Sequence, residues 1–458
     1  MSLSTVTPEL PMHLVTDEIL TRLPSKSLMG FMCVSKPWLS LIRSRYFCNR
    51  FLTVPSPRLY MCLRDQTTYD DYVLLTLAPQ DTGPATSTFV VDHSQNDTQM
   101  GGYILQNLGG FMFYVYWKKP RIHNPATGQF ITLPFSKSKH MVVPPGGEKN
   151  VAYFFGYDPI SNKYKVISLV SVFLEETRVV ISSENRVLVL KHGRGSWRKA
   201  ALTPTDFCPH VPSKGGISID GVIYYLAWLD LYRLVVVSFD IRSEEFNMIH
   251  VPKLDESILK DDLTLLECGG KATLFDQINL RDKGVLALWT VEDVGSEKWS
   301  CKSLVLKPSQ LPLVNSFKVR AELSVQMWPF RMIIFGGWKH KLHWLPSKTG
   351  SVQGTTQNGN VLLIPEDFIS PFHILSYDLR SNDMRKIEIE GIPDRWFNMD
   401  EGAEVRVDVM FMDQSESLIY SDFLSSLDWE EERKIARSKK RATKSKKIKK
   451  NKKESEKK

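Results

Sequence analysis

The chain has 458 residues, 42% of them hydrophobic, which is enough to bury a large core. Its six cysteines are scattered without a CxxC pair, which argues against a disulfide framework and against a zinc site. No apolar run approaches the roughly 18 residues of a membrane span, and no signal-peptide pattern opens the sequence, so we expect a soluble protein of a reducing, intracellular compartment.

Positive charge is concentrated at the carboxyl end of the sequence. The net charge is +8, but residues 433–458 contain 15 Lys or Arg and two Glu, a balance of +13, which leaves the preceding residues at −5. A lysine-rich segment with few apolar residues predicts a disordered tail over 429–458. Such a tail serves nuclear import, phosphate binding or solubility, and the sequence leaves these three interpretations open. The candidates for a nuclear-import signal are Lys439, Lys440, Arg441, Lys444, Lys446, Lys447, Lys449 and Lys450.

Helical periodicity is confined to the first fifty or so residues. Val15, Ile19 and Leu23 recur every four residues, which predicts a helix with one inward-facing stripe. Pro24 ends this helix, because its ring clashes with a continuing turn. Ser35 stands where it can cap a later helix. The pattern as a whole predicts three short helices.

These helices need more apolar surface than they supply to each other. About forty residues bury too little surface for an independent fold. Leu10 and Pro11 also stand before the first helix, where the chain itself offers no core. A small self-sufficient bundle is the alternative interpretation, but an apolar face completed by another molecule accounts better for both residues.

The segment from Leu10 to Leu52 resembles the F-box, the helical module by which substrate receptors dock onto a Skp-family adaptor in cullin-based ubiquitin ligases. The resemblance rests on many fixed spacings held over the whole segment, among them those of Leu10-Pro11 and Leu23-Pro24. It implies that the adaptor is contacted by Leu10, Pro11, Leu14, Ile19, Leu20, Leu23, Pro24, Leu28, Val34 and Trp38.

Two positions depart from the pattern of that family. His13 stands where an acidic, helix-capping residue is usual, and Gly30 stands where a long basic side chain is common. A missing cap costs about 0.5–2 kcal/mol, and a mid-helix glycine costs about 1 kcal/mol relative to alanine. Weaker adaptor binding than is usual for the family is therefore a hypothesis.

Between about residues 60 and 420 the pattern changes to short apolar runs rich in Val, Ile, Tyr and Phe, separated by Gly, Pro, Asn and Asp. Runs of this length and composition are typical of β-strands. The region is therefore predicted to be all-β, as a set of sandwiches, a barrel or a propeller. The runs are Phe111–Trp117, Val151–Phe155, Val166–Val172, Val187–Leu190, Ile217–Ile219, Val222–Leu226, Leu234–Phe239, Val285–Leu288, Met332–Phe335 and Ile374–Tyr377.

A weak internal repeat favours the propeller. Asp158, Asp240 and Asp378 each follow an aromatic residue and each precede, by six residues, a large apolar residue. We expect each Asp to start a hairpin turn by accepting hydrogen bonds from the backbone two residues further on. At about 40 to 50 residues per blade, the 82 residues from Asp158 to Asp240 predict nearly two blades, and the 138 residues from Asp240 to Asp378 predict nearly three.

The order of motifs in this region resembles the F-box-associated domain of plant F-box proteins. The resemblance spans roughly residues 100–390 and implies a kelch-type β-propeller that is used as a substrate receptor. A polar insert at Ser347–Gly359 departs from it and is interpreted as a mobile loop. The matching phrases are Asn124-Pro125 with Leu133-Pro134, Phe155–Pro159 with Tyr164–Val166, Trp197-Arg198, Gly216–Ala227, Phe239-Asp240, and Leu266-Glu267 with Gly270.

The sequence therefore predicts a multidomain protein of the α plus all-β class. A helical F-box domain occupies residues 5–52, a linker residues 53–60, a β-propeller of six to eight blades residues 61–428, and the disordered basic tail residues 429–458.

Patterns that carry catalytic chemistry are weak throughout the chain. His340 and His343 have no third ligand near them in the sequence, so neither a metal site nor a cofactor is expected. The repeated Asp residues recur in one local context, which favours turns over acid–base catalysis. Trp228 and Trp396 are aromatic residues that would anchor a partner if they lay at loop tips.

Together these features predict the substrate-recognition subunit of an SCF-type (Skp–cullin–F-box) ubiquitin ligase without a catalytic residue of its own, in the nucleus, the cytoplasm or both. Its predicted partners are the Skp-family adaptor, the cullin and RING subunits reached through it, and an unknown protein target. No membrane partner is expected, and nucleic acid is not favoured. The alternatives are a protein-binding scaffold with a degenerate F-box and, disfavoured by the lack of ligands, a copper oxidase on a propeller.

Overall fold

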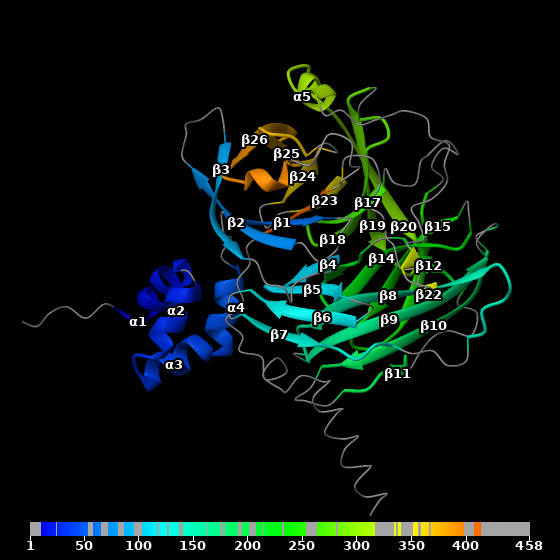
Figure 1. Ribbon diagram of the computed structural model, residues 1–458, viewed down its shortest axis with the longest axis horizontal. Helices are drawn as coiled ribbons and strands as arrows, with labels where there is room; N and C mark the ends of the chain where they lie inside the picture. Colours follow the sequence, from blue (N-terminus) through cyan, green and yellow to red (C-terminus); the bar gives the residue numbers. More distant parts are fainter. Residues whose placement is uncertain are drawn as a thin grey trace, which may run out of the picture.

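In the computed structural model, a group of helices lies beside a large body of β-sheets (Figure 1). Within the described residues, no helix combines the length and the apolar character that a membrane span requires. The structure describes residues 11–23, 25–53, 58–65, 72–80, 87–95, 103–116, 119–125, 128–136, 141–161, 163–174, 177, 179–190, 195–200, 208–213, 215–230, 233–252, 263–280, 283–316, 334–335, 338–339, 351–355, 359–365, 368–397 and 407–413.

The amino-terminal helices share a small core of their own. Leu20, Leu28 and Ile42 are at most 2% exposed and belong to one cluster. The hydroxyl of Ser35 accepts a hydrogen bond from the amide of Trp38 at 3.4 Å, so Ser35 caps α3 as the sequence predicted. The helices are α1 (Met12–Leu14), η1 (Val15–Ile19), η2 (Leu20–Arg22), α2 (Ser25–Met32), α3 (Lys36–Arg43) and α4 (Arg45–Thr53).

The predicted inward stripe of Val15, Ile19 and Leu23 is wrong at its middle position. Ile19 is 45% exposed, and its neighbour Leu20 turns inward instead. The reason is that η1 is a π-helix, whose wider turn rotates the side chains that follow it around the helix axis.

A further helix also follows the three that were predicted. The hydroxyl of Ser44 accepts from the amide of Phe47 at 3.2 Å and starts α4. It is the last helix before β1 (Leu59–Asp65), and Figure 1 shows it between the other helices and the β-sheets.

The described strands form one eight-stranded, one five-stranded and three four-stranded sheets, besides the short pair β21 and β22. We count the eight-stranded sheet as two, sheets 1 and 6, which are joined by the parallel pairing of β26 with β3, and number all six in chain order. Sheet 1 contains β27 (Val407–Asp413), β1 (Leu59–Asp65), β2 (Tyr72–Gln80) and β3 (Ser87–Gln95); sheet 2 contains β4 (Tyr103–Leu108), β5 (Phe111–Tyr116), β6 (Lys119–Asn124) and β7 (Gln129–Thr132); sheet 3 contains β8 (Gly147–Asp158), β9 (Lys163–Leu174), β10 (Val180–Val189) and β11 (Arg198–Lys199).

The remaining sheets follow the same antiparallel order. In sheet 4, two short strands pair with different parts of one neighbour, β14. Sheet 4 contains β12 (Val211–Pro212), β13 (Ile217–Ile219), β14 (Val222–Trp228), β15 (Leu234–Asp240) and β16 (Phe246–His250); sheet 5 contains β17 (Leu263–Cys268), β18 (Lys271–Asp276), β19 (Val285–Asp293) and β20 (Lys298–Val305); sheet 6 contains β23 (Ser351–Thr355), β24 (Asn360–Ile364), β25 (Phe372–Asp378) and β26 (Asp383–Glu390); α5 (Leu311–Ser316), η4 (Asp394–Trp396) and the pair β21 (Ile334–Phe335) and β22 (Trp338–Lys339) lie outside them.

Apolar cores between neighbouring sheets close the body into a ring. Every sheet shares one buried cluster with the sheet before it and another with the sheet after it, as in a β-propeller, which confirms the predicted fold. The number of blades in the whole chain stays a prediction. In order from sheets 1 and 2 to sheets 6 and 1, the clusters join Tyr60 with Met112, Phe113 with Phe155, Phe154 with Tyr225, Leu226 with Leu274, Phe275 with Tyr377, and Leu63 with Ile374.

The two ends of the β-region close the ring against each other. β27, the last strand, pairs antiparallel with β1, the first, along its whole length from Asp413↔Leu59 to Val407↔Asp65. The outer strands β26 and β3 also pair, from Ile387↔Ser87 to Glu390↔Val90. Both pairings cover strand edges that would otherwise be open to other chains.

Two expectations about the propeller need correction. Asp240 ends the third strand of sheet 4 and Asp378 ends the third strand of sheet 6. Among the described residues, the 138 residues between them therefore span two blades and not nearly three. Asp158 instead ends the first strand of sheet 3, so the repeated turn marks either of the two hairpins of a blade. The insert Ser347–Gly359 is not a loop throughout, because Ser351–Thr355 forms β23 and pairs with β24.

Candidate functional site

The helices present a group of apolar side chains to solvent. Met12 is 63% exposed, Leu14 40% and Val34 68%, and Ile19 and Phe31 are also exposed. The ring of Phe31 lies 5.6 Å from that of Trp38, which belongs partly to the core. Singly exposed apolar residues are ordinary, but a group of them on one small domain marks an interaction site.

The structure divides the predicted adaptor contacts into a surface and its support. Pro11, Leu14, Ile19 and Val34 are exposed and are available to a partner. Leu23 and Trp38 are partly buried. Leu20 and Leu28 are at most 2% exposed and pack in the core that the helices share. Leu10 and Pro24 lie outside the described residues. The direct contacts remain a prediction, but for Leu20 and Leu28 the structure assigns a supporting place.

Hydrogen bonds between helices fix this surface. The hydroxyl of Tyr46 on α4 donates to both carboxylate oxygens of Asp17 on η1, at 3.0 and 3.1 Å. This hydrogen bond raises the pKa of Tyr46, because it stabilises the protonated phenol. Within the first helices, Thr16 donates to the carbonyl of Met12 at 2.8 Å and Thr21 to that of Asp17 at 2.7 Å.

Sequence reasoning missed three members of this site. Met12, Phe31 and Tyr46 are all exposed but were not among the predicted contacts. Met12 follows Leu10-Pro11 directly, which was a signal for it. The position of Tyr46 depends on its contact with Asp17, 29 residues earlier, and no local pattern reveals such a contact.

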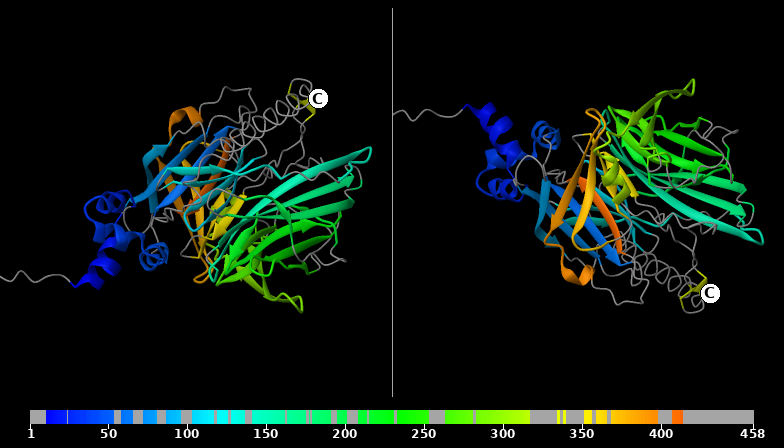
Figure 2. Two further views of the ribbon diagram at one scale, coloured as in Figure 1. Left: turned by 90° about the horizontal axis from the view of Figure 1, so that it is seen from below. Right: turned by 90° about the horizontal axis from the view of Figure 1, so that it is seen from above.

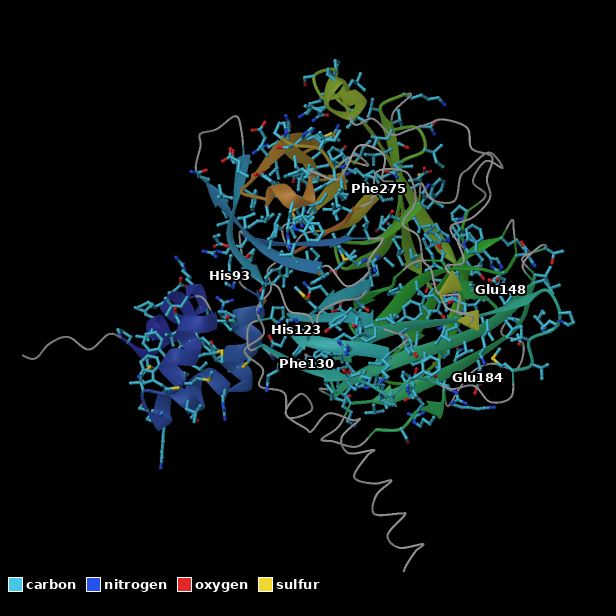
Figure 3. The ribbon with its side chains drawn as sticks, in the orientation of Figure 1. His93, His123, Phe130, Glu148, Glu184 and Phe275 are labelled. Carbon is cyan, nitrogen blue, oxygen red and sulfur yellow. The ribbon has the colours of Figure 1, made fainter. Side chains whose placement is uncertain are left out.

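The helices lie at one end of the propeller, which we call the hairpin end. In each sheet, the turn between the first and second strands lies at this end, as at Gly109-Gly110 and Asp220-Gly221. The turn between the third and fourth strands lies at the same end, because antiparallel strands reverse direction at each turn. Figure 3 shows His123 and Phe130, at the hairpin of β6 and β7, on the side of the helices, and Glu148, near the start of β8, far from them. The opposite end, where the connections between sheets run, is therefore free of the helices.

The repeated Asp residues form turns at the hairpin end. Asp158 accepts from the amide of Ile160 at 3.0 Å, Asp240 from that of Arg242 at 2.8 Å, and Asp378 from that of Arg380 at 2.8 Å, as predicted. The hydroxyl of Ser161 lowers the pKa of Asp158 and that of Ser381 lowers the pKa of Asp378. The three carboxylates belong to three different sheets, so they make no shared acid–base site.

The other candidates do not form a site in the described part of the chain. Trp228 is 8% exposed and Trp396 is 2% exposed, so neither projects as a partner anchor. His340, His343 and the basic tail lie outside the described residues. The described residues contain no group of three or more His, Cys, Asp or Glu side chains placed to hold a metal ion.

The structure thus combines a small helical module that exposes several apolar side chains with a β-propeller. Residues 9–50 match the model of the F-box domain, and residues 58–327 and 324–415 match that of the F-box associated beta propeller domain. The chain belongs to the family of F-box proteins with an F-box-associated propeller. F-box domains generally bind Skp-family adaptors.

The chain is similar to three F-box proteins of Arabidopsis thaliana. It is 40% identical over 413 residues to F-box/LRR-repeat protein At2g40920, covering 88% of this chain and 86% of that protein. It is 37% identical over 427 residues to F-box protein At2g40925, covering 90% and 93%. It is 45% identical over 239 residues to F-box only protein 8, covering 52% and 78%.

Proposed function

We propose that this protein is the substrate-recognition subunit of an SCF-type ubiquitin ligase. The helices dock the Skp-family adaptor, and the propeller recruits a protein target. The single observation that carries the proposal is the exposed apolar group on the helices, formed by Met12, Leu14, Ile19 and Val34, in a segment that matches the F-box. Burying each large apolar side chain against an adaptor contributes about 1.5–3 kcal/mol.

The placement of the two surfaces supports a receptor role. The helices sit at the hairpin end, and the opposite end of the propeller extends away from them (Figure 1). A target held at that far end does not compete with the adaptor for space. The protein then acts without a catalytic residue of its own. Its contribution to rate is proximity, since holding a target lysine near a ubiquitin thioester raises the effective concentration of the two groups.

We further propose that the protein acts in the nucleus, the cytoplasm or both. The lysine clusters from Lys439 to Lys450 are of the kind that import receptors bind. A fluorescent fusion of the full chain, compared with one in which these lysines are replaced by glutamine, measures their effect on the nuclear fraction. A fraction that the replacement leaves unchanged contradicts the import role.

The test of the adaptor-binding role is a pull-down with a purified Skp-family adaptor. Leu10→Ala combined with Pro11→Ala is expected to abolish adaptor binding while the propeller keeps its thermal transition. The matched control is Val305→Ala, which removes a side chain that is 60% exposed on the propeller and leaves the helices intact. Undiminished capture of the adaptor by the double variant would reject the proposal. Capture of the adaptor without cullin would instead favour a scaffold that works outside a ligase.

A further inference from the structure

Charge is divided unevenly along the chain. The helical segment, residues 11–53, contains six Lys or Arg and two Asp or Glu, a balance of +4. Residues 54–432 contain 38 Lys or Arg and 46 Asp or Glu, a balance of −8, and residues 433–458 carry +13. The helices and the basic tail therefore share a positive sign, opposite to that of the region between them.

Positive side chains are exposed on the same helices as the apolar group. Lys36 is exposed at the start of α3, two residues after Val34, which is 68% exposed. Arg43 at the end of α3 and Arg50 of α4 are also exposed. An apolar centre with a polar rim is the usual anatomy of a protein–protein interface, so a partner that buries the apolar group also meets these charges.

The two carboxylates of the helical segment are engaged within the helices. Glu18 pairs with Arg22 at 2.6 Å in i,i+4 spacing. Asp17 is partly buried and accepts the two hydrogen bonds from Tyr46. The field that a partner meets at the helices is therefore positive on balance, and the partner surface that complements it is acidic.

Strand pairing brings the start of the tail to the same part of the molecule. Asp413, the last residue of β27, pairs with Leu59, the first residue of β1. Leu59 follows Thr53, the end of α4, by six residues, which span at most about 22 Å. Paired strand residues lie about 4.5–5.5 Å apart, so the chain leaves β27 within about 30 Å of the helices. In both views of Figure 2, the blue and orange strands of the sheet that contains β1 and β27 lie nearer to the helices than the green strands do.

The lysine clusters are far enough along the chain to reach past the helices. Lys439 follows Asp413 by 26 residues, and 26 residues span up to about 90 Å. Ions at about 0.1 M salt screen exposed charges that are more than about 10 Å apart. The lysines can therefore attract an approaching partner at distances from which the charges fixed on the helices do not act.

The propeller is the other acidic surface open to these lysines. Its charge of −8 is spread over residues 54–432, and some of its carboxylates already have basic partners. Glu244 is bound by Lys165 and Arg198, and Glu292 by Lys271. The positive helices, in contrast, select an acidic partner in the place where the tail begins.

We propose that the lysine clusters from Lys439 to Lys450 and the exposed Lys and Arg side chains of the helices together attract an acidic surface of the adaptor. The lysines gather the adaptor near the helices, and the charges of the helices orient it before the apolar group is buried. Attraction of this kind raises the association rate more than the lifetime of the complex. The inference rests on the proposed function, because it takes the partner of the helices to be the Skp-family adaptor.

The test is the association rate of the full chain with a purified Skp-family adaptor, measured by stopped-flow fluorescence at 50 and 500 mM salt. Replacing the lysines from Lys439 to Lys450 with glutamine should lower the rate at least 5-fold at 50 mM salt. At 500 mM salt the loss should be less than twofold, because salt screens the charges. The dissociation rate should change less than twofold at either salt concentration.

A charge-retaining variant separates charge from sequence. Permuting the order of residues 439–450 keeps every charge and should retain the association rate within twofold. A loss in the permuted variant would indicate that a receptor reads the sequence of the tail.

Single substitutions test the part played by the helices. Lys36→Gln should lower the association rate about twofold at 50 mM salt, and Lys36→Arg should restore it. The matched control is Lys302→Gln, which removes an exposed charge from β20 of the propeller and should leave the rate unchanged.

Four outcomes overturn the inference alone. One is an equal rate for the unmodified chain and the glutamine variant at 50 mM salt. A second is a faster rate for the glutamine variant, which would mean that the propeller holds the lysines. A third is a loss that persists at 500 mM salt. The fourth is binding of a 20-base-pair DNA duplex that the glutamine variant loses while its adaptor rate is unchanged, which would assign the lysines to nucleic acid. Absence of adaptor binding by the unmodified chain at either salt concentration would instead reject the proposed function, and this inference with it.

Discussion

Lys165 of β9 and Glu244 of the turn before β16 form an ion pair, with 2.7 Å between Nζ and Oε1, across the boundary between sheets 3 and 4. Both side chains are less than a tenth exposed. The Nζ of Lys165 also donates to the carbonyl of Ile241, and Arg198 of β11 donates to both carboxylate oxygens of Glu244. One carboxylate therefore joins three separate segments of two blades.

Glu244→Gln should destabilise the propeller by about 3–5 kcal/mol, because it leaves the buried Lys165 without a countercharge. Glutamine keeps the size of the side chain and the positive φ of 63° at this turn, so the variant isolates the charge. Urea denaturation followed by tryptophan fluorescence measures the loss. The control is Asp230→Asn, which breaks a pair with the largely exposed Arg233 and should cost at most about 1 kcal/mol. Equal losses for both variants would contradict the assigned role.

His210 should make the stability of the propeller dependent on pH. Burial lowers its pKa from 6.5 to about 4. Its Nδ1 carries the proton, since it lies 3.1 Å from the carbonyl of Cys208, and its Nε2 accepts from the hydroxyl of Tyr225 at 2.9 Å. The unfolded chain takes up a proton near pH 6.5 and the folded chain only near pH 4. Stability should therefore fall by about 3 kcal/mol as the pH is lowered through this window.

His210→Gln should remove this slope, because glutamine forms hydrogen bonds but does not titrate between pH 6.5 and 4. His93→Gln is the control, because His93 is exposed and its replacement should leave the slope unchanged. Denaturant melts at half-unit steps of pH give the comparison. A slope that survives in His210→Gln would assign the effect to another group.

Asp240→Ala should cost about 1–3 kcal/mol of stability. The side chain accepts from the amides of Arg242 and Ser243, both at 2.8 Å, and each bond contributes about 0.5–1.5 kcal/mol. Asp240→Asn should cost much less, because an amide oxygen accepts the same bonds. Thermal unfolding of the two variants decides between a turn-forming acceptor and a required charge. A loss in Asp240→Asn as large as that in Asp240→Ala would favour the charge.

Leu14→Asp and Leu28→Ala should both abolish adaptor pull-down for different reasons. Leu14 is 40% exposed, so Leu14→Asp should leave the helices folded while it disrupts the apolar surface. Leu28 is fully buried, and its truncation should cost about 2–5 kcal/mol, enough to unfold a domain with so small a core. Hydrogen exchange of the helix amides over residues 11–53 in the full chain, alone and with adaptor, separates the two effects. Helix loss in Leu14→Asp would refute the division into surface and support.

The sequence was sufficient for features that depend on neighbouring residues. The Asp turns at Asp158, Asp240 and Asp378 formed as predicted, because an Asx turn involves only the next two or three amides. The cap by Ser35 is equally local. The apolar runs became strands for the same reason, since β-branched and aromatic residues favour the pleated backbone. The family resemblance added the order of these elements, and the family is shown.

Positions that depend on distant residues were not predictable. The inward place of Leu20 instead of Ile19 follows from a π-helical turn, and β23 within a polar insert exists because β24 offers it a partner. The spacing from Asp240 to Asp378 predicted too many blades because 45 residues, 306–350, separate β20 from β23.

The sequence by itself determined that helices come first, that strands follow and where many of the strands turn, because such choices are made over a few residues. Only the tertiary structure decided which apolar residues face solvent and that β27 returns to pair with β1. The physical reason is that burial and strand pairing depend on what lies across space, and segments more than 300 residues apart, such as β1 and β27, meet only when the ring closes.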